Sequence, residues 1–209
     1  MKDQTLTTYK AIIFDLGAVL VDWNPRYLYR KIFDKTEDME YFLSNICTSE
    51  WNEEQDAGRS LQDGTELLVS QHPAHEANIR AYYGRWKEML NGEISGTVAL
   101  LESLKKSGKY QLYALTNWSN ETFPLALVQY PFMQWFDGIV VSGREKQRKP
   151  SPSFYHLLLD RYHVKAAEAL FIDDNPRNVK AAEALGINSI LFTDPVQLQH
   201  ALSDKNILS

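Results

Sequence analysis

The stretch AIIFDLG, residues 11–17, decides the fold, because a short apolar run ends there in an acidic side chain. Ala11 to Phe14 lack polar alternation, which predicts a buried strand of a parallel sheet covered on both faces. Asp15 follows this strand directly, and Gly17 is expected to let the backbone change direction sharply. In open parallel sheets, ligands bind beyond the carboxyl ends of the strands. Asp15 is therefore a candidate site residue, although a lone aspartate after a strand can equally well cap a turn.

Downstream of this stretch, strand patterns alternate with helical patterns. The predicted strands cover residues 110–115, 138–141, 169–172 and 189–192, and the predicted helices cover residues 96–106, 119–128, 151–162 and 176–185. Such alternation is typical of parallel strands joined by helical crossovers. The sequence therefore predicts an α/β fold with a doubly wound, Rossmann-like parallel sheet.

After the first strand, residues 18–22 are expected to form a short turn or hairpin, and from Asn24 to about Leu90 the sequence contains only helical patterns. Apolar residues recur at helical spacing, and Ser60 is a candidate helix cap. The Asn-Gly pair at residues 91–92 predicts a turn. The block is too long for a simple crossover, so we predict an all-helical cap domain at residues 23–91. The α/β core domain then consists of residues 1–22 and 92–209.

Composition limits the classes of partner and compartment. The chain has 209 residues, of which 44% are hydrophobic and 23% charged, as in soluble globular proteins. Its net charge of −5 does not favour nucleic acid or an anionic membrane as a partner. Cys47 is the only cysteine, so an intrachain disulfide is impossible and a reducing compartment is the simplest interpretation. Because Asp15 interrupts the first apolar stretch and no run could span a bilayer, we expect a cytoplasmic protein.

Side chains with useful chemistry follow the predicted strands or precede a helix. They are Asp15, Thr116, Asn117, Lys149, Asp173 and Asp174. Each has an ordinary interpretation alone, because such residues often cap helices or turns. Together they suit phosphoryl chemistry. Three carboxylates at one edge of a sheet need a hard cation such as Mg²⁺, and a hydroxyl, backbone amides and an ammonium group bind phosphoryl oxygens.

With these motifs the sequence resembles the haloacid dehalogenase-like hydrolases, most of which are phosphatases with an aspartate nucleophile. The matching stretches are FDLGAVLVDW (14–23), LTNWS (115–119), KPSPSFY (149–155) and FIDDNPRNVKAAEALGI (171–187). Their order and spacing agree with the family, and the helical insertion is similar to the family's helical cap.

The resemblance implies roles around a phosphoryl group. Asp15 is the expected nucleophile, which forms an aspartyl-phosphate and also binds Mg²⁺. Thr116 is expected to donate its hydroxyl to the phosphoryl group with Asn117 assisting, and Lys149 is expected to neutralise charge. Covalent catalysis of this kind splits one difficult displacement into two easier ones.

The resemblance also implies the ligands of the cation. Asp174 is the expected direct ligand beside Asp15. Asp173 is expected to be either a further ligand or an outer partner. Gly17 keeps the backbone carbonyl that the family offers to the metal.

Gly17 also marks a departure from most phosphatases of the family, which carry a second aspartate two residues after the nucleophile. That aspartate is a general acid and base, a contribution worth roughly 10²–10⁴-fold in rate. A glycine variant of this motif occurs among the family's sugar-phosphate phosphatases, which this chain resembles. We hypothesise that Asp22, a cap residue or water supplies the proton, although Asp22 is also readily explained as a solvated turn residue.

Three other functions remain open from the sequence. A haloacid dehalogenase uses the same nucleophile on carbon without Mg²⁺, but known dehalogenases tend to carry a bulky residue at the position of Gly17. A phospho-acceptor signalling domain uses a similar set of residues in a different order along the chain. A catalytically silent phospho-ligand binding protein would keep the metal site without turnover.

The cap is expected to choose the substrate, because a site at a sheet edge is open and needs a lid. Trp23 and Trp51 are candidate substrate contacts, together with the acidic residues Glu50, Glu53 and Glu54, although tryptophans at helical spacing more often belong to the core. The sequence as a whole predicts a Mg²⁺-dependent phosphatase of a small phosphorylated metabolite, such as a sugar phosphate.

Overall fold

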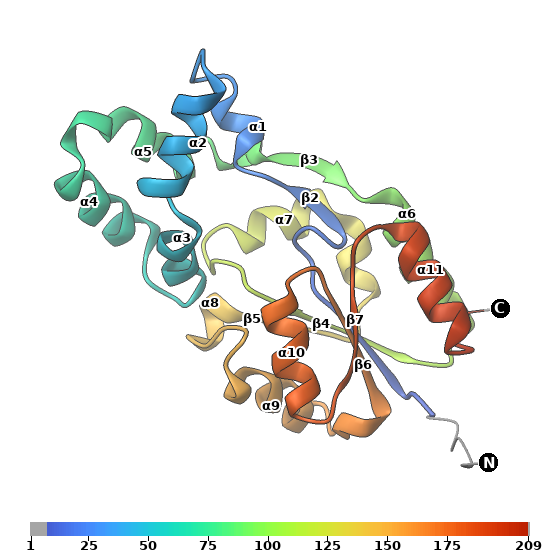
Figure 1. Ribbon diagram of the computed structural model, residues 1–209. Helices are drawn as coiled ribbons and strands as arrows, with labels where there is room; N and C mark the ends of the chain where they lie inside the picture. Colours follow the sequence, from blue (N-terminus) through green and yellow to red (C-terminus); the bar gives the residue numbers. More distant parts are fainter. Residues whose placement is uncertain (1–7, 209) are drawn as a thin grey trace.

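The protein, described here from a computed structural model of residues 8–208, is built on a five-stranded parallel sheet (Figure 1). The strand order is β5-β4-β1-β6-β7. The strands are β1 (Ala11–Phe14), β4 (Gln111–Thr116), β5 (Gly138–Val141), β6 (Ala169–Asp173) and β7 (Asn188–Leu191). All four pairings are parallel. The predicted α/β fold with a doubly wound sheet is therefore confirmed.

Helices cover both faces of this sheet. They are α6 (Ser95–Ser107), α7 (Phe123–Gln129), α8 (Ser142–Glu145), α9 (Pro152–Arg161), α10 (Pro176–Ala184) and α11 (Pro195–Asp204), with the 3₁₀ turns η3 (Pro131–Trp135) and η4 (Ala166–Glu168). The central strand β1 is buried along its whole length. Ile12 and Phe14 belong to the apolar cluster that contains residues of α6 and α11, whereas Ala11 and Ile13 belong to the cluster formed with α9 and α10. A strand covered on both faces explains why its sequence lacks polar alternation.

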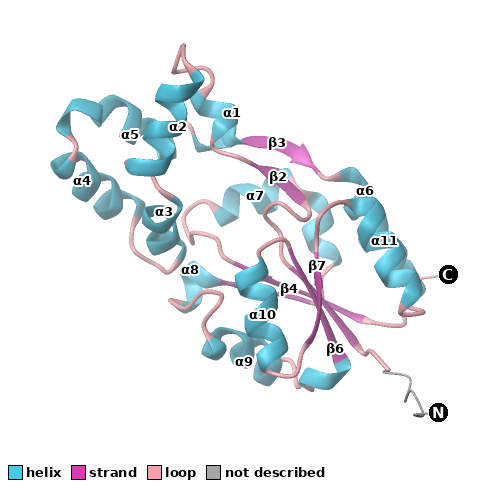
Figure 2. Ribbon diagram, in the orientation of Figure 1, coloured by secondary structure: helices cyan, strands magenta, loops and turns pink. Residues whose placement is uncertain are grey.

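A separate group of helices lies between β1 and α6 in the sequence and away from the sheet in space (Figures 1 and 2). It comprises α1 (Arg26–Tyr29), α2 (Thr36–Asn45), α3 (Ser49–Asp56), α4 (Leu61–Gln71), η1 (Pro73–His75), α5 (Glu76–Gly84) and η2 (Trp86–Met89). The Ser60 side chain accepts a hydrogen bond from the Asp63 backbone amide, as its position before α4 predicted. We call this group the cap; its proposed boundaries, residues 23–91, stay a prediction.

Aromatic side chains fill the interior of the cap. Ring centroids lie 5.0 Å apart between Tyr29 and Phe42, and again between Trp51 and Tyr82. The Trp51 indole nitrogen donates to the Gly64 carbonyl oxygen at 3.0 Å. Trp51 is therefore a core residue of the cap.

The predicted turn at residues 91–92 is wrong, because Leu90–Glu93 forms a strand, β3, that pairs antiparallel with β2 (Val21–Trp23). The Asn24 amide donates to the Met89 carbonyl at 2.8 Å, which extends the pairing toward the cap. Each segment is short, and each is stabilised by a partner far away in the sequence. This strand pair joins the cap to the sheet domain at both points where the chain crosses between them.

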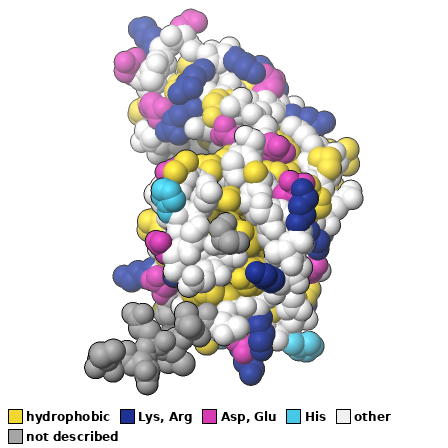
Figure 3. Space-filling view, turned by 90° about the vertical axis from the view of Figure 1, so that its right-hand side faces the viewer, with side chains coloured by type: hydrophobic (Ala, Val, Ile, Leu, Met, Phe, Trp, Pro, Cys, Tyr) yellow, Lys and Arg dark blue, Asp and Glu magenta, His cyan; other side chains and the backbone are white. Residues whose placement is uncertain are grey.

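Charge is mixed over the face of the molecule that carries α6 and α11, where acidic and basic side chains are interspersed (Figure 3). On this face, therefore, the side chains do not form the concentrated basic patch that nucleic-acid phosphates attract. Among the helices of residues 8–208, none combines the length and the apolar character that a bilayer crossing requires.

Candidate active site

Three site residues meet because their strands are neighbours. In the sheet β1 lies between β4 and β6, so the carboxyl ends of all three strands point to the same edge. Asp15 follows β1, while Thr116 and Asp173 are the last residues of β4 and β6. The carboxylates of Asp15, Asp173 and Asp174 offer oxygens that all lie within 4.8 Å of one another.

Lys149 lies between two of these carboxylates. Its ammonium nitrogen is 2.9 Å from Asp15 Oδ1 and 2.7 Å from Asp173 Oδ2. The residue is only 1% exposed, so its charge depends on these partners for compensation. Burial by itself lowers the pKa of Lys149, but the charges of Asp15 and Asp173 outweigh it and raise the pKa overall. The side chain is therefore a fixed ammonium group at the centre of the site.

The surroundings of Asp15 disfavour the charged form of its carboxylate. Burial raises its pKa most, Lys149 lowers it, and the charges of Asp173 and Asp174 raise it again, to about 7. Its Oδ1 atom accepts a hydrogen bond of 2.7 Å from the Leu16 backbone amide. Three carboxylates face one ammonium group here, so the site has the charge and the oxygen ligands that a hard divalent cation prefers.

The two consecutive aspartates differ in their surroundings. Asp173 is fully buried, and its carboxylate accepts hydrogen bonds from the Asn175 amide, the Asn178 side chain and Lys149. Asp174 lies at the surface of the site, where partial burial and the charge of Asp173 raise its pKa. Asp174 thus has free oxygens to offer a cation, whereas those of Asp173 already have partners.

Thr116 and Asn117 serve the site in different ways. Within residues 8–208, the buried Thr116 hydroxyl has no hydrogen-bond partner. Such an unpaired buried group costs stability, which points to a ligand that the hydroxyl would contact. The Asn117 side chain accepts from the Lys149 backbone amide at 2.9 Å and donates to the Lys149 carbonyl at 3.0 Å. Asn117 therefore fixes the backbone that carries the central lysine.

The turn after β1 differs from the sequence expectation. The positive φ angle of 58° belongs to Ala18, while the backbone of Gly17 needs no left-handed conformation. A Cβ atom built on Gly17 would meet no other atom within 4 Å. The glycine is therefore not required by the backbone, and its missing side chain leaves open space beside Asp15.

The structure holds Asp22 outside this space. Its carboxylate accepts hydrogen bonds from the Tyr27 hydroxyl at 2.9 and 3.0 Å and from the Asn91 side chain at 2.9 Å. These contacts bind it to the strand pair that joins cap and sheet. Asp22 is also absent from the lining of the pocket beside Gly17.

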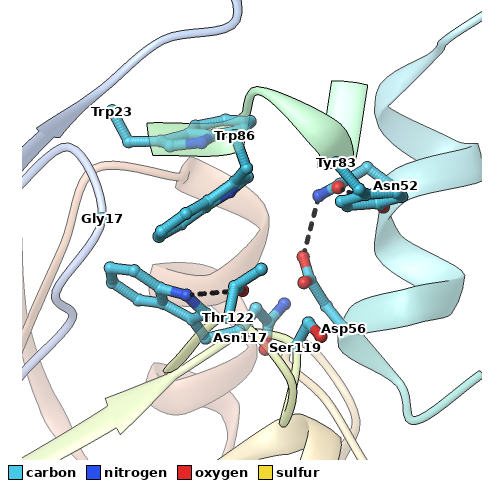
Figure 4. Close-up of a pocket in the computed structure, with 10 residues that line it drawn as sticks. Gly17, Trp23, Asn52, Asp56, Tyr83, Trp86, Asn117, Ser119 and Thr122 are labelled. Atoms are coloured by element: carbon cyan, nitrogen blue, oxygen red, sulfur yellow. Dashed lines mark hydrogen bonds between the residues drawn. The ribbon is translucent and has the colours of Figure 1, made fainter. Parts of the chain in front are cut away.

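A pocket of about 70 Å³ opens beside Gly17, between the sheet domain and the cap (Figure 4). Four of its ten lining residues are aromatic, and the full lining is Gly17, Trp23, Asn52, Asp56, Tyr83, Trp86, Asn117, Trp118, Ser119 and Thr122. Trp23 was a sequence candidate for this role. Asp56 was not, although it is a carboxylate in a mostly apolar wall. Its sequence context is an ordinary acidic helix, and only the docking of the cap brings it here.

The cap contacts the sheet domain through an ion-pair network. Glu53 on α3 lies 2.6 Å from Arg148 and 2.7 Å from Arg177, and Glu54 lies 3.6 Å from Arg148. Arg148 directly precedes the central Lys149. Of the acidic run considered as substrate contacts, Glu53 and Glu54 thus bind the sheet domain, and Glu50 is exposed to solvent.

Known proteins are similar to this chain in sequence and in fold. The family model of the haloacid dehalogenase-like hydrolases matches residues 12–192. A sesquiterpene phosphatase of Aspergillus oryzae is 32% identical over 188 residues, covering 90% of this chain and 92% of that protein. A phosphorylated carbohydrates phosphatase of Thermotoga maritima is 26% identical over 206 residues, covering 95% and 89%. A HAD-family enzyme of Bacteroides thetaiotaomicron, solved with magnesium and inorganic phosphate, has the same fold, with a TM-score of 0.66, 21% identity and coverage of 89% and 95%.

Proposed function

This chain belongs to the haloacid dehalogenase-like hydrolase family, and we propose that it is a Mg²⁺-dependent phosphatase that hydrolyses a small phosphate monoester through an aspartyl-phosphate on Asp15. The observation that carries the proposal is the buried ammonium group of Lys149 between Asp15 and Asp173, beside the unpaired hydroxyl of Thr116. Two relatives with phosphatase names support the same reaction class.

In this proposal the residues at the strand ends bind the phosphoryl group. The Thr116 hydroxyl donates to a phosphoryl oxygen and gains the partner that it lacks among the described residues. Lys149 stabilises the negative charge on the phosphoryl oxygens and keeps Asp15 oriented at 2.9 Å. Asn117 contributes by positioning the lysine backbone.

The carboxylates would hold the cation. Asp15, Asp174 and the Gly17 carbonyl would be its protein ligands, with Asp173 either a further ligand or the partner that orients Lys149. The three aspartates each offer a carboxylate oxygen, and these oxygens lie within 4.8 Å of one another. When bound, Mg²⁺ supplies positive charge that offsets the repulsion among carboxylates and phosphate.

The lining of the pocket indicates which organic group the substrate carries. Three tryptophans, Trp23, Trp86 and Trp118, line it together with Tyr83, and the Trp86 and Trp118 ring centroids are 5.9 Å apart. Aromatic walls of this kind favour burial of apolar or unsaturated carbon. We therefore propose that an apolar phosphate monoester is a better substrate than a sugar phosphate of similar size.

A phosphate-release screen tests the proposal. Apolar and sugar phosphates are supplied with Mg²⁺ or with a chelator, and Asp15→Asn serves as the control. We expect release that requires both Mg²⁺ and Asp15, with the highest kcat/KM for an apolar ester. Release of halide from 2-haloacids without Mg²⁺ would instead identify a dehalogenase. Tight phosphate-ester binding with no turnover would identify a silent binding protein.

Thr116→Val separates function from stability. The hydroxyl has no partner within the described residues, so its loss is expected to change the free energy of unfolding by less than about 1 kcal/mol. The rate should nevertheless fall about 10²–10³-fold, as when one donor to a transition-state oxygen is removed. Steady-state kinetics and thermal unfolding are the two measurements.

Thr97 offers the matched control, because its hydroxyl is also buried without a partner in residues 8–208 but belongs to helix α6 and not to the end of a sheet strand. Thr97→Val should leave the rate unchanged. Equal rates for the Thr116 and Thr97 variants would remove Thr116 from the phosphate site.

Glu53→Gln tests the ion pairs that dock the cap. Partly exposed ion pairs are each worth up to about 1 kcal/mol, so losing two should lower kcat/KM by up to roughly 30-fold. The difference from the wild type should shrink at high salt, which screens the pairs. Glu66→Gln is the control, since Glu66 pairs with Arg80 inside the cap. An equal effect of both changes would contradict a docking role.

A further inference from the structure

Open space lies beside Gly17, where the chain has no side chain. At this position most phosphatases of the family carry the carboxylate that moves the proton, and here a Cβ atom would meet nothing within 4 Å. The space is continuous with the pocket, since Gly17 is one of its lining residues. A proton-transfer group supplied from elsewhere would have to reach this same pocket.

Among the residues that line the pocket, Asp56 is the one that carries a carboxylate. It is the last residue of α3, and its side chain extends from the cap into the pocket, across from Gly17 (Figure 4). The Ser119 backbone amide, which belongs to the loop after β4, lies close enough to lower the pKa of this carboxylate. Asp56 therefore lies beside the loop that follows β4 and begins with Asn117.

A chain of hydrogen bonds fixes its orientation. The Gln55 side chain donates to the Tyr83 hydroxyl at 3.0 Å, and that hydroxyl donates to Asn52 Oδ1 at 2.9 Å. Asn52 consequently presents its amide nitrogen to Asp56 Oδ2, at 3.0 Å. Within residues 8–208, no lysine, arginine or histidine lies within ion-pair distance of this carboxylate. The group is thus held by the neutral amide of Asn52, which suits a residue that changes its charge during a reaction.

Its protonation behaviour suits the same role. Burial raises the pKa of Asp56, and the nearby charge of Glu53 raises it further, while the Ser119 amide and Arg148 lower it. The resulting value is about 7, so both the acid and the carboxylate are populated at neutral pH. General acids and bases are most effective when their pKa lies near the working pH.

We propose that Asp56, supplied by the cap, is the proton-transfer residue that takes the place of the carboxylate missing at Gly17. The inference rests on the proposed phosphatase function. It also makes catalysis depend on the closed position of the cap, because α3 brings Asp56 and the docking residue Glu53 together.

The reaction then proceeds in two steps. An Asp15 oxygen bonds to phosphorus while the bond from phosphorus to the alcohol oxygen breaks, and that oxygen takes the proton of the Asp56 carboxylic acid. The Asp56 carboxylate next takes a proton from water as the water oxygen bonds to phosphorus and the bond to Asp15 breaks. Inorganic phosphate leaves, Asp15 is again a carboxylate and Asp56 is again protonated.

The test compares two esters that differ in their need for a proton. Benzyl phosphate releases a basic alkoxide that must be protonated, whereas 4-nitrophenyl phosphate releases a stable phenolate. In Asp56→Asn, kcat/KM for benzyl phosphate should fall about 10²–10⁴-fold, and kcat/KM for 4-nitrophenyl phosphate by less than about tenfold. The variant should also show a burst of one nitrophenolate per enzyme followed by slow turnover, because the second step needs the base.

Three further variants make the outcome decisive. Asp38→Asn, an exposed change on α2 of the cap, should behave as the wild type. Gly17→Asp in the Asp56→Asn background should recover part of the benzyl phosphate rate, since the space can hold the new side chain. Asp22→Asn tests the alternative carboxylate, and finding the leaving-group effect there instead of at Asp56 would overturn the proposal.

Equal losses for both esters, with no burst, would show that Asp56 is merely structural, and unchanged rates would show that it is dispensable. Either result overturns the inference while the phosphatase assignment stands. The phosphatase assignment itself fails if the wild type shows no Mg²⁺-dependent turnover or if Asp15→Asn retains it. The burst in Asp56→Asn also reports that the variant is folded, because it requires an intact site.

Discussion

Asp15→Asn is expected to abolish turnover, with a loss of up to about 10⁶-fold, the scale reached when a covalent nucleophile is removed. An amide at this position cannot attack phosphorus as the carboxylate does, while every other group of the site remains. Initial rates with an apolar phosphate ester and Mg²⁺ measure the effect. Turnover within tenfold of the wild type would exclude Asp15 as the nucleophile.

The same variant should be at least as stable as the wild type when no divalent cation is present. Asp15, Asp173 and Asp174 converge within 4.8 Å, so removing one carboxylate relieves repulsion. A thermal unfolding midpoint equal to or above that of the wild type, in the presence of a chelator, is the expected result. The comparison also serves as the folding control for the loss of activity.

Lys149→Met should produce the largest loss of stability. The lysine is 1% exposed and neutralises Asp15 at 2.9 Å and Asp173 at 2.7 Å, so its removal leaves buried carboxylates unpaired. Breaking a buried ion pair by removing one partner costs about 3–5 kcal/mol. For a chain of this size that corresponds to a decrease in Tm of roughly 6–20 °C, which calorimetry measures directly.

Two comparisons establish the cause of that loss. Lys165→Met removes an exposed lysine and should change Tm little, because the Lys165 side chain is 79% exposed. In the Asp15→Asn background, Lys149→Met should cost less than in the wild type, since one of the stranded carboxylates is already gone. Additive effects of the two changes would contradict the direct coupling described above.

The sheet and the residues at its edge could be predicted from the sequence for a local reason. Buried parallel strands are continuous apolar runs, so β1 and β6 each end where the sequence changes abruptly to aspartate. Since the carboxyl ends of neighbouring parallel strands share an edge, Asp15, Thr116 and Asp173 could be expected to meet before any coordinates were known. The matching family model confirms the resemblance on which their proposed roles depend.

Features that depend on distant partners could not be predicted in this way. The strands β2 and β3 are only three and four residues long and are stabilised by pairing with each other. Helix α11 is not among the helices predicted from the sequence, although the Asp194 side chain caps it by accepting from the Val196 and Gln197 amides, a signal that the sequence does contain. Asp56 looks like one more acid on a solvated helix, and its surroundings come from how the cap docks on the loop after β4.

Trapping the covalent intermediate tests the central claim most directly. The wild-type enzyme is mixed with Mg²⁺ and an apolar phosphate ester, quenched during turnover and reduced with borohydride, which converts an aspartyl-phosphate to homoserine. The proposed aspartyl-phosphate mechanism predicts homoserine at position 15, dependent on both the ester and Mg²⁺ and absent from Asp15→Asn. Continued turnover with no modification at position 15, or with the modification at another aspartate, would contradict it.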